Sequence, residues 1–378
     1  MNLPLINTSE NNIWQKRLKI FWRSLHLDIP LLIGILLLTV LGLFILYSAS
    51  AENIALIYQQ SMRLVVGFIA MVIVAQISPH KYKIISPWLF GTSLVLLLAV
   101  LGVGAISKGA QRWLNLGLFR IQPSEVLKLA TPMMLAWYLN DKHLPPNFKI
   151  LSVCLLLISM PVILIAKQPD LGTAIIVVTT GILVLFLGGI GWRYIIGAII
   201  AISSIIPILW HFMHTYQRAR ILTFLNPEKD PLGNGYHIIQ SKIALGSGGL
   251  FGKGWLNGTQ SHLHFLPEHT TDFIFAVCGE ELGFMGCILL ITTFTYIVGR
   301  GLYISSQAQD TFTRLLSGSL VLTLFISFFV NIGMVIGILP VVGLPLPMVS
   351  YGGTSMIILM IEFGILMSIH SHKKLLSN

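Results

Sequence analysis

Long apolar runs alternate with short polar segments along almost the whole chain. Apolar runs of roughly 18 or more residues are candidates for membrane-spanning helices. The fourth run is the weakest, because Glu125 and Lys128 lie inside it. The pattern predicts about ten spans, at about 29–49, 61–78, 87–106, 124–140, 150–166, 171–189, 192–212, 271–298, 314–338 and 350–370.

Composition supports this interpretation. Of the 378 residues, 55% are hydrophobic and only 10% are charged, whereas a soluble domain carries about 25% charged residues. We therefore predict an all-α polytopic membrane protein with about ten transmembrane helices and one long extracytoplasmic loop. In a membrane protein the distribution of the positive charge over the two sides of the membrane has to be considered first. The net charge of +10 therefore does not indicate nucleic-acid binding. The three cysteines lie inside apolar runs, which predicts buried thiols.

The charges between the spans predict the orientation. The basic N-terminal tail has no early apolar core, so we expect no cleavable signal peptide. An even number of spans places both chain ends on one side, and the Lys and Arg residues of alternate short loops fall on that side if it is cytoplasmic. We expect cytoplasmic tails at 1–28 and 371–378, a membrane domain at 29–370 and a long outer loop at about 213–270.

Two outer loops hold cations that this rule does not predict. The short loop after the third span and the long outer loop both contain them, among others Lys108, Arg112, Arg120, Arg218, Arg220, Lys229, Lys242 and Lys253. An anionic ligand would explain the cations, and a diphosphate is one such ligand, because Arg and Lys bind phosphate oxygens through charge-assisted hydrogen bonds. A solvated basic surface beside anionic lipid headgroups explains them as well.

Carboxylates at the ends of spans are the candidates for chemistry. Asp272 stands at the water-facing start of the eighth span, and Glu280 and Glu281 follow about two helical turns, or ~12 Å, deeper. Ionised groups in a span usually face a cavity, a partner or a substrate path. Asp272 is therefore the candidate catalytic residue, for chemistry on a lipid-linked substrate with a polar head group.

Three further polar positions have both a structural and a functional interpretation. Glu125 and Lys128 share a helix face, either as an internal ion pair or as a functional pair. Asp170 directly precedes an apolar run and is predicted to cap a helix, with Lys167 as its counter-charge.

The glycine-rich segment of the long outer loop lacks the context of a nucleotide site. The segment GSGGLFGKG (246–254) does not follow a strand, which argues against a P-loop, and the preceding GYHIIQSKIALGSGG predicts a short amphipathic surface helix. The loop before the tenth span contains three prolines and Ser350. Either it re-enters the protein to line a central site, or the prolines end one helix and delay the next.

A metal ion remains an open possibility. The histidines near Asp272 lack the spacing of a zinc motif, so a structural zinc site is not expected. A labile Mg²⁺ or Mn²⁺ held between Asp272 and a phosphate group needs few protein ligands. No other cofactor is expected. Glu362 lies within the tenth span and needs a partner that the sequence does not name.

Several long motifs together resemble the SEDS family of bacterial membrane proteins, its elongation branch more closely than its division branch. They are KGAQRWLNLGLFRIQPSE, KQPDLGTA, FLNPEKDPLGNGYHIIQSKIALGSGGLFGKGW, FLPEHTTDFIFAVCGEELG and GILPVVGLPLPMVSYGGTS. The resemblance covers almost the whole chain after the N-terminal tail. It implies a ten-helix peptidoglycan glycosyltransferase of the bacterial inner membrane that polymerises lipid II. It also implies a complex with a class B penicillin-binding protein, the transpeptidase, within the cell-elongation machinery.

The resemblance also assigns residues. Asp272 matches the essential aspartate of the family, while Glu125, Asp170 and the Glu280–Glu281 pair match its other acidic motifs. The family usually has a histidine just before its Thr-Asp pair. This chain has Thr270 there, and His269 stands one place earlier.

The reaction implied by the resemblance is an inverting transfer. The GlcNAc 4-hydroxyl of one lipid II would attack the MurNAc C1 of the lipid-linked strand, and undecaprenyl diphosphate would leave. Asp272 is expected to be the general base or to hold a metal ion. The predicted substrate-binding residues are Glu125, Lys128, Asp170, Arg112, Arg218, Arg220, Lys242, Glu281 and Ser350.

Two other functions fit parts of the pattern. A lipid II flippase would also contain cations and buried carboxylates, but it needs them along the whole path across the bilayer, whereas these motifs cluster on the outer side. A non-catalytic scaffold of the transpeptidase would tolerate an isosteric change at Asp272.

Overall fold

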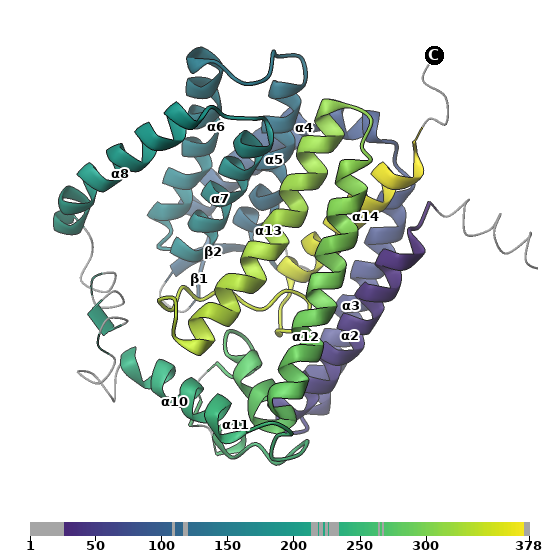
Figure 1. Cartoon of the computed structure of the whole chain (residues 1–378), viewed down its shortest axis with the longest axis vertical. Coiled ribbons are helices and arrows are strands. Elements are labelled where there is room, and N and C mark those ends of the chain that lie inside the picture. The colour runs from purple at the N-terminus through teal and green to yellow at the C-terminus, as the bar shows by residue number, and fades with distance from the viewer. Residues whose placement is uncertain are drawn as a thin grey trace, which may run out of the picture.

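Long helices make up most of this protein (Figure 1). The computed structural model describes residues 26–107, 110–115, 120–212, 218, 222–223, 226, 234–263, 265–266 and 268–373. The helices are α2 (Ile29–Ala49), α3 (Ile54–Ala75), α4 (Pro79–Val103), α5 (Pro123–Asn140), α6 (Phe148–Lys167), α7 (Leu171–Leu187), α8 (Trp192–Phe212), α10 (Asn234–Ser247), α11 (Thr259–His262), α12 (Ile274–Ser306), α13 (Thr311–Ile336) and α14 (Thr354–Ser371).

The predicted spans coincide with long helices. Each of the ten predicted runs overlaps one of α2–α8 and α12–α14 in the described ranges. Seven of the described helices, namely α2, α3, α4, α6, α12, α13 and α14, are long and apolar enough to cross a membrane. Helix α7 is apolar but has 17 residues, and α5 carries the Glu125–Lys128 pair. The prediction of a helical, multi-pass membrane protein is confirmed.

Helix boundaries differ from the hydropathy pattern where polar residues continue a helix. Helix α3 begins at Ile54 rather than near residue 61, because the Asn53 side chain accepts a hydrogen bond from the Leu56 N–H and caps the helix. Gln60, which hydropathy places outside the span, is buried in this first part of α3. Helix α4 likewise begins early, with Pro79 in its first turn.

A small antiparallel sheet departs from the all-helical prediction. Strands β1 (Ala105–Ser107), β2 (Ala110–Asn115) and β3 (Arg120–Ile121) follow α4 in the order β1-β2-β3. The strands are only two to six residues long, too short to give a periodic signal that stands out beside the spans. The sheet folds the loop between α4 and α5 back toward the bundle and so places Arg112.

Helices α12 and α13 form the centre of the bundle, and α2, α5, α7 and α14 pack around them. Helix α8 stands at one side of the bundle in Figure 1. Helix α10 packs across the ends of α12 and α13, where the Ser241 hydroxyl donates to the Val335 carbonyl at 2.9 Å. This is the predicted amphipathic helix, with its apolar face on the bundle.

Helix α12 is interrupted at Gly283, and the glycine loop completes it. Gly283 has a φ of 67° and a ψ of −163°, which breaks the helical hydrogen bonds. The Phe284 N–H donates to the Gly249 carbonyl at 3.0 Å, and the Lys253 N–H donates to the Glu280 carbonyl at 3.0 Å. A Cβ at Gly252 would lie 2.0 Å from the Glu281 carbonyl oxygen, so the loop approaches the helix more closely than other residues allow. The 248–254 glycines therefore serve helix packing.

Candidate functional site

Asp272 lies in the turn just before α12 and is partly exposed. Its backbone carbonyl accepts a hydrogen bond from the Asn331 side chain of α13 at 2.9 Å, and the same amide donates to the Leu344 carbonyl at 2.6 Å. Gly343 has a φ of 77°, and a Cβ built there would lie 3.5 Å from Asp272 Oδ2. The carboxylate therefore faces the loop between α13 and α14, residues 337–353.

Ser350 and Tyr351 attach this α13–α14 loop to the Asp272 turn. The Ser350 hydroxyl donates to the Thr271 carbonyl and accepts from the Leu346 N–H at 2.8 Å. The Tyr351 N–H donates to the Thr270 carbonyl at 2.9 Å. These hydrogen bonds hold the Asp272 turn against the α13–α14 loop. The predicted site residue Ser350 therefore positions the backbone of this turn, and it also faces a cavity.

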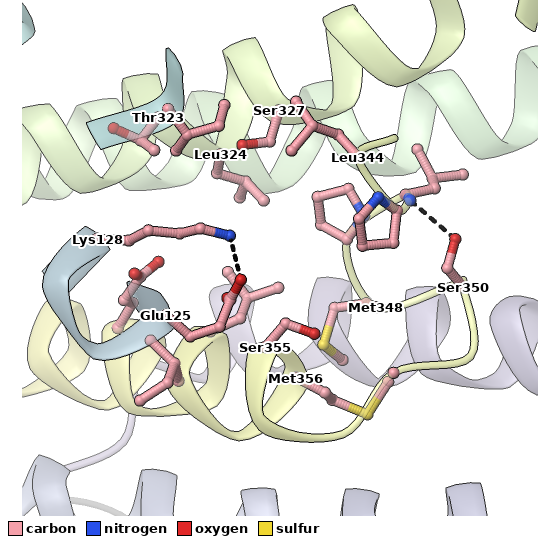
Figure 2. A pocket seen from close by; sticks show the side chains of 18 residues that line it. Glu125, Lys128, Thr323, Leu324, Ser327, Leu344, Met348, Ser350, Ser355 and Met356 are labelled. Atoms are coloured by element: carbon pink, nitrogen blue, oxygen red, sulfur yellow. Dashed lines mark hydrogen bonds and ion pairs between the residues drawn. The ribbon is translucent and has the colours of Figure 1, made fainter. Parts of the chain in front are cut away.

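The cavity lies between α5, α7, α13, α14 and the α13–α14 loop (Figure 2). It has a volume of about 90 Å³. Its polar lining includes Glu125, Lys128, Ser350 and Glu362, and the rest is largely apolar. Asp272 is not among the described residues that line it. The α13–α14 loop connects the two places, because Leu344 and Ser350 face the cavity and also bond the residues around Asp272.

Glu125 and Lys128 form the predicted ion pair inside this cavity. The Lys128 Nζ lies 2.7 Å from Glu125 Oε1, and the two side chains are 17% and 9% exposed. Both stand in the first turns of α5, which begins with Pro123. The structure thus confirms the pair, and its position in the cavity is compatible with a functional role as well.

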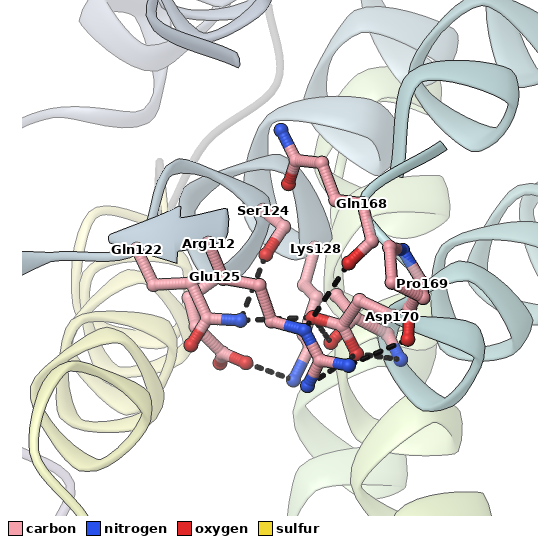
Figure 3. A network of polar contacts seen from close by, with 9 residues as sticks. Arg112, Gln122, Ser124, Glu125, Lys128, Gln168, Pro169 and Asp170 are labelled. Atoms are coloured by element: carbon pink, nitrogen blue, oxygen red, sulfur yellow. Dashed lines mark hydrogen bonds and ion pairs between the residues drawn. The ribbon is translucent and has the colours of Figure 1, made fainter. Parts of the chain in front are cut away.

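Asp170 caps α7 and organises a polar network (Figure 3). Its carboxylate accepts from the Thr173 N–H at 3.4 Å and from Gln122 Nε2 at 2.9 Å. Arg112 Nη1 lies 3.8 Å from Asp170 Oδ1, and the same guanidinium donates to the Gln168 and Pro169 carbonyls. The predicted cap is confirmed. The predicted counter-charge, Lys167, is wrong, because the sheet brings Arg112 to the carboxylate instead.

The two adjacent glutamates of α12, Glu280 and Glu281, have different hydrogen-bond partners. Ser48 of α2 donates to Glu281 Oε1 at 2.6 Å. Glu280 is fully buried and binds Lys253 Nζ at 2.7 Å, the Thr259 hydroxyl at 2.9 Å and the Gln260 N–H at 3.1 Å. Glu280 thus anchors the loop before α12, and the predicted substrate-binding residue Glu281 contacts α2 away from the cavity lining.

The structure describes only some of the outer-loop cations that the sequence predicts to bind substrate. Lys242 lies on α10 beside Gly337, the left-handed C-cap of α13, where a Cβ would meet Lys242 Nζ at 2.9 Å. An ammonium there stabilises the negative end of the helix dipole. Arg218 is described only as an isolated residue, and Arg220 lies outside the described residues.

The metal hypothesis rests on Asp272 alone. In the described ranges no three His, Cys, Asp or Glu side chains lie close enough to hold an ion together. His269 Nδ1 lies 2.8 Å from the Leu266 carbonyl, where it donates. A Mg²⁺ or Mn²⁺ at Asp272 would therefore take its other ligands from phosphate oxygens and water.

Sequence reasoning missed a polar group on α3. The Arg63 guanidinium lies 4.6 Å above the Tyr351 ring and donates to the Gly352 carbonyl at 3.5 Å. Gln59 accepts from the Tyr351 hydroxyl at 2.8 Å, and Gln60 donates to the Ser350 carbonyl at 3.3 Å. The sequence feature that could have indicated this polar group is Arg63, a cation within a predicted span.

Comparisons with known proteins agree with this arrangement. The family model described as "Cell cycle protein", which covers FtsW, RodA and SpoVE, matches residues 29–375. The chain belongs to the FtsW/RodA family, the SEDS proteins. It is 53% identical over 360 residues to peptidoglycan glycosyltransferase MrdB of Escherichia coli K12, covering 95% of this chain and 97% of that protein. It is 37% identical to a probable peptidoglycan glycosyltransferase FtsW of Geobacter metallireducens, covering 92% and 95%.

Solved structures place the fold in the same family. RodA of Thermus thermophilus is similar with a TM-score of 0.69 and 28% identity, covering 92% of this chain and 98% of that one. A chain from a structure described as the coordination of polymerization and crosslinking by a peptidoglycan synthase complex gives a TM-score of 0.81 and 32% identity, covering 91% and 97%. The predicted SEDS membership is confirmed.

Proposed function

We propose that Asp272 is the general base with which this peptidoglycan glycosyltransferase lengthens glycan strands from lipid II. Its relatives at 53% identity bear the name of that activity. The catalytic role of Asp272 is supported by the contacts of the α13–α14 loop, residues 337–353. This loop holds the Asp272 turn through Ser350 and Tyr351 and also forms one wall of the charged cavity. A base and a charged binding cavity are thereby fixed relative to each other.

In the proposed reaction the GlcNAc 4-hydroxyl of one lipid II gives its proton to an Asp272 carboxylate oxygen. Its oxygen forms a bond to MurNAc C1 of the lipid-linked strand. The bond from C1 to the phosphate oxygen breaks, and undecaprenyl diphosphate leaves with the electron pair, inverting the configuration at C1. General base catalysis contributes typically about 10²–10⁴-fold to such a step.

The leaving diphosphate requires positive charge. Lys128 lies in the cavity, and Arg112 belongs to the polar network around Asp170 (Figure 3). Arg112 already has Asp170 and two carbonyls as partners, so Asp170 would orient it, while Lys128 presents donors toward the cavity. Arg218, Arg220 and Lys242 remain proposed contacts of the diphosphate from the long loop. Glu125, Glu281 and Ser350 remain proposed members of the substrate-binding set.

The orientation and the partner are part of the same proposal. Both chain ends would be cytoplasmic, so that Asp272 and the α10 loop face the outer side of the inner membrane, where lipid II carries its sugars. A transpeptidase of the class B penicillin-binding type would act with this chain in cell elongation, since one structural relative comes from a peptidoglycan synthase complex.

The test is lipid II polymerisation by purified protein together with its transpeptidase, comparing wild type with Asp272→Asn. The matched control is Asp141→Asn, an exposed aspartate at the end of α5 whose ion pair with Lys83 joins this end to the start of α4. We expect strands from wild type and control and at least about a hundredfold less from Asp272→Asn. Equal polymerisation by a folded Asp272→Asn protein would refute the base assignment. Transfer of lipid II between leaflets without any strand formation would favour a flippase.

A further inference from the structure

Arg63 is a cation inside α3 that forms no ion pair with a carboxylate in the described part of the chain. Its guanidinium lies 4.6 Å from the centre of the Tyr351 ring and donates to the Gly352 carbonyl at 3.5 Å, which is long for a hydrogen bond. A guanidinium carries five N–H donors, and the other four have no acceptor among the described residues. Ionisable groups inside membrane helices are costly and usually mark a functional site.

Gln59 adds further donors one helical turn before Arg63. Its side chain is exposed, and its Oε1 accepts from the Tyr351 hydroxyl at 2.8 Å. The two N–H groups of its amide have no acceptor among the described residues. Tyr351 connects the two side chains, because its ring contacts Arg63 and its hydroxyl bonds Gln59. One positive charge and several N–H donors suit a phosphate group, whose oxygens arginine binds through paired, charge-assisted hydrogen bonds.

The Arg63–Gln59 cluster contacts the α13–α14 loop from α3. The cavity that holds Lys128 is instead lined by α5, α7, α13, α14 and the loop itself. Gly352 connects the two places, since it lines the cavity and its carbonyl accepts from Arg63. Tyr351 connects the cluster to the catalytic side, because its N–H donates to the backbone of the Asp272 turn. The loop that holds this turn therefore borders one cation in the cavity and a second cation on α3.

We propose that Arg63 and Gln59 bind the diphosphate of the acceptor lipid II, the molecule whose GlcNAc 4-hydroxyl attacks. This inference rests on the proposed function. The transfer joins two lipid-linked molecules that each carry a diphosphate, and only the diphosphate of the growing strand leaves. Lys128 is the proposed contact of that leaving group, so the acceptor requires a second cationic subsite. Through Tyr351, an acceptor bound at Arg63 is held in a fixed position relative to Asp272.

The experiment couples two analogues that cannot exchange roles, using the full chain with its transpeptidase. The donor is lipid II whose GlcNAc lacks the 4-hydroxyl. The acceptor is lipid II in which a methylene group replaces the oxygen between MurNAc C1 and phosphorus, so its diphosphate cannot leave. For Arg63→Gln we expect the KM for the acceptor to rise about tenfold, which corresponds to about 1.4 kcal/mol. The kcat and the KM for the donor should stay unchanged, because the acceptor diphosphate is bound equally before and during transfer.

Two further variants separate charge from geometry. Arg63→Lys keeps the charge and loses the paired donors, so the KM for the acceptor should rise by less, about threefold. Arg193→Gln removes an exposed arginine charge at the start of α8 and should leave both KM values unchanged. With lipid II itself as donor and acceptor, Arg63→Gln should raise the KM and keep the kcat.

A truncated acceptor and a phospholipid identify the bound group. An acceptor analogue with one phosphate in place of two should have a higher KM with wild type, and Arg63→Gln should then add little, since both changes remove the same contact. If added phosphatidylglycerol changes the rate of wild type but not of Arg63→Gln, and the two proteins share one acceptor KM without it, the cluster binds phospholipid headgroups and the proposal is wrong.

The remaining outcomes separate this inference from the proposed function. An unchanged KM for the acceptor in a folded Arg63→Gln protein refutes the inference. A fall in kcat alone does so too, because Arg63 would then only hold the α13–α14 loop, and so does a rise in the KM for the donor alone. In each case the wild type still forms the glycosidic bond, so the proposed function stands. If the wild type couples neither the analogues nor lipid II, the proposed function itself fails.

Discussion

Asn331 offers the sharpest test of how Asp272 is positioned. Its side chain is fully buried and donates one hydrogen bond to the Asp272 carbonyl at 2.9 Å and one to the Leu344 carbonyl at 2.6 Å. Its own carbonyl oxygen, Oδ1, has no hydrogen-bond partner among the residues that the structure describes. The residue therefore works as a double donor between the Asp272 turn and the α13–α14 loop, and Asn331→Leu removes both bonds while keeping the branching and the number of side-chain heavy atoms.

The expected cost follows from these two bonds. Each contributes about 0.5–1.5 kcal/mol net, and each buried carbonyl left without a partner costs about 1–3 kcal/mol. We expect Asn331→Leu to lower the free energy of unfolding by about 2–4 kcal/mol. A displacement of about 1 Å at a reacting group can reduce a rate about a hundredfold, so kcat should fall by up to that factor. Asn331→Asp should be worse, because Nδ2 donates to both carbonyls and a carboxylate oxygen in its place would face both of them.

The assay combines thermal unfolding in detergent with lipid II polymerisation at saturating substrate. Thr180→Val is the matched control, because it breaks a buried 3.0 Å hydrogen bond between α7 and α13 that involves neither the Asp272 turn nor the α13–α14 loop. The control should lose stability and keep its kcat. If Asn331→Leu retains wild-type kcat at a temperature where it is folded, then Asn331 does not position the catalytic turn and the argument fails.

Two further predictions concern stability. Gly252→Ala should lower the free energy of unfolding by several kcal/mol, roughly 3 or more, because its Cβ would collide with an α12 carbonyl at 2.0 Å and its φ is 78°; thermal unfolding against Gly246→Ala, where nothing lies within 4 Å of a Cβ, checks this. Burial raises the pKa of Asp28, but the hydrogen bonds from Arg300 and from the Leu31 N–H outweigh burial and leave the pKa below its usual value. The stability that this pKa shift provides is present above the usual aspartate pKa and is lost as the pH falls through the lowered value. Arg300→Gln should therefore flatten the acid side of a melting-temperature profile, and an unchanged profile would contradict this.

Much of the fold could be predicted, because each span carries its own signal. A run of apolar residues is detectable without knowing its neighbours, and the ten predicted runs meet ten helices. The cap at Asp170 and the ion pair between Glu125 and Lys128 were also predictable, because both depend on residues three apart in one helix. Such local rules work equally well in water and in a membrane.

The candidate site was predictable only in part, since its geometry depends on contacts between distant segments. Nothing in the sequence near Asp170 indicates Arg112 as its partner, which arrives through a sheet too short to predict. Glu281 and Glu280 look equivalent in sequence, yet one binds α2 and the other the preceding loop. Glu362 shares a cavity with the Glu125–Lys128 pair because α14 packs against α5, and no local sequence pattern indicates this contact.

The interruption of α12 has a consequence for how the protein is made. During synthesis the glycine loop leaves the ribosome before α12 does. The loop is therefore already present when α12 forms. A solitary α12 would expose unpaired backbone groups around Gly283, each costing several kcal/mol in lipid. The 249–254 loop supplies those partners. The eighth span, α12, therefore completes its backbone hydrogen bonds only with a segment that is not itself a span. A fragment that begins at α12 would lack these hydrogen-bond partners.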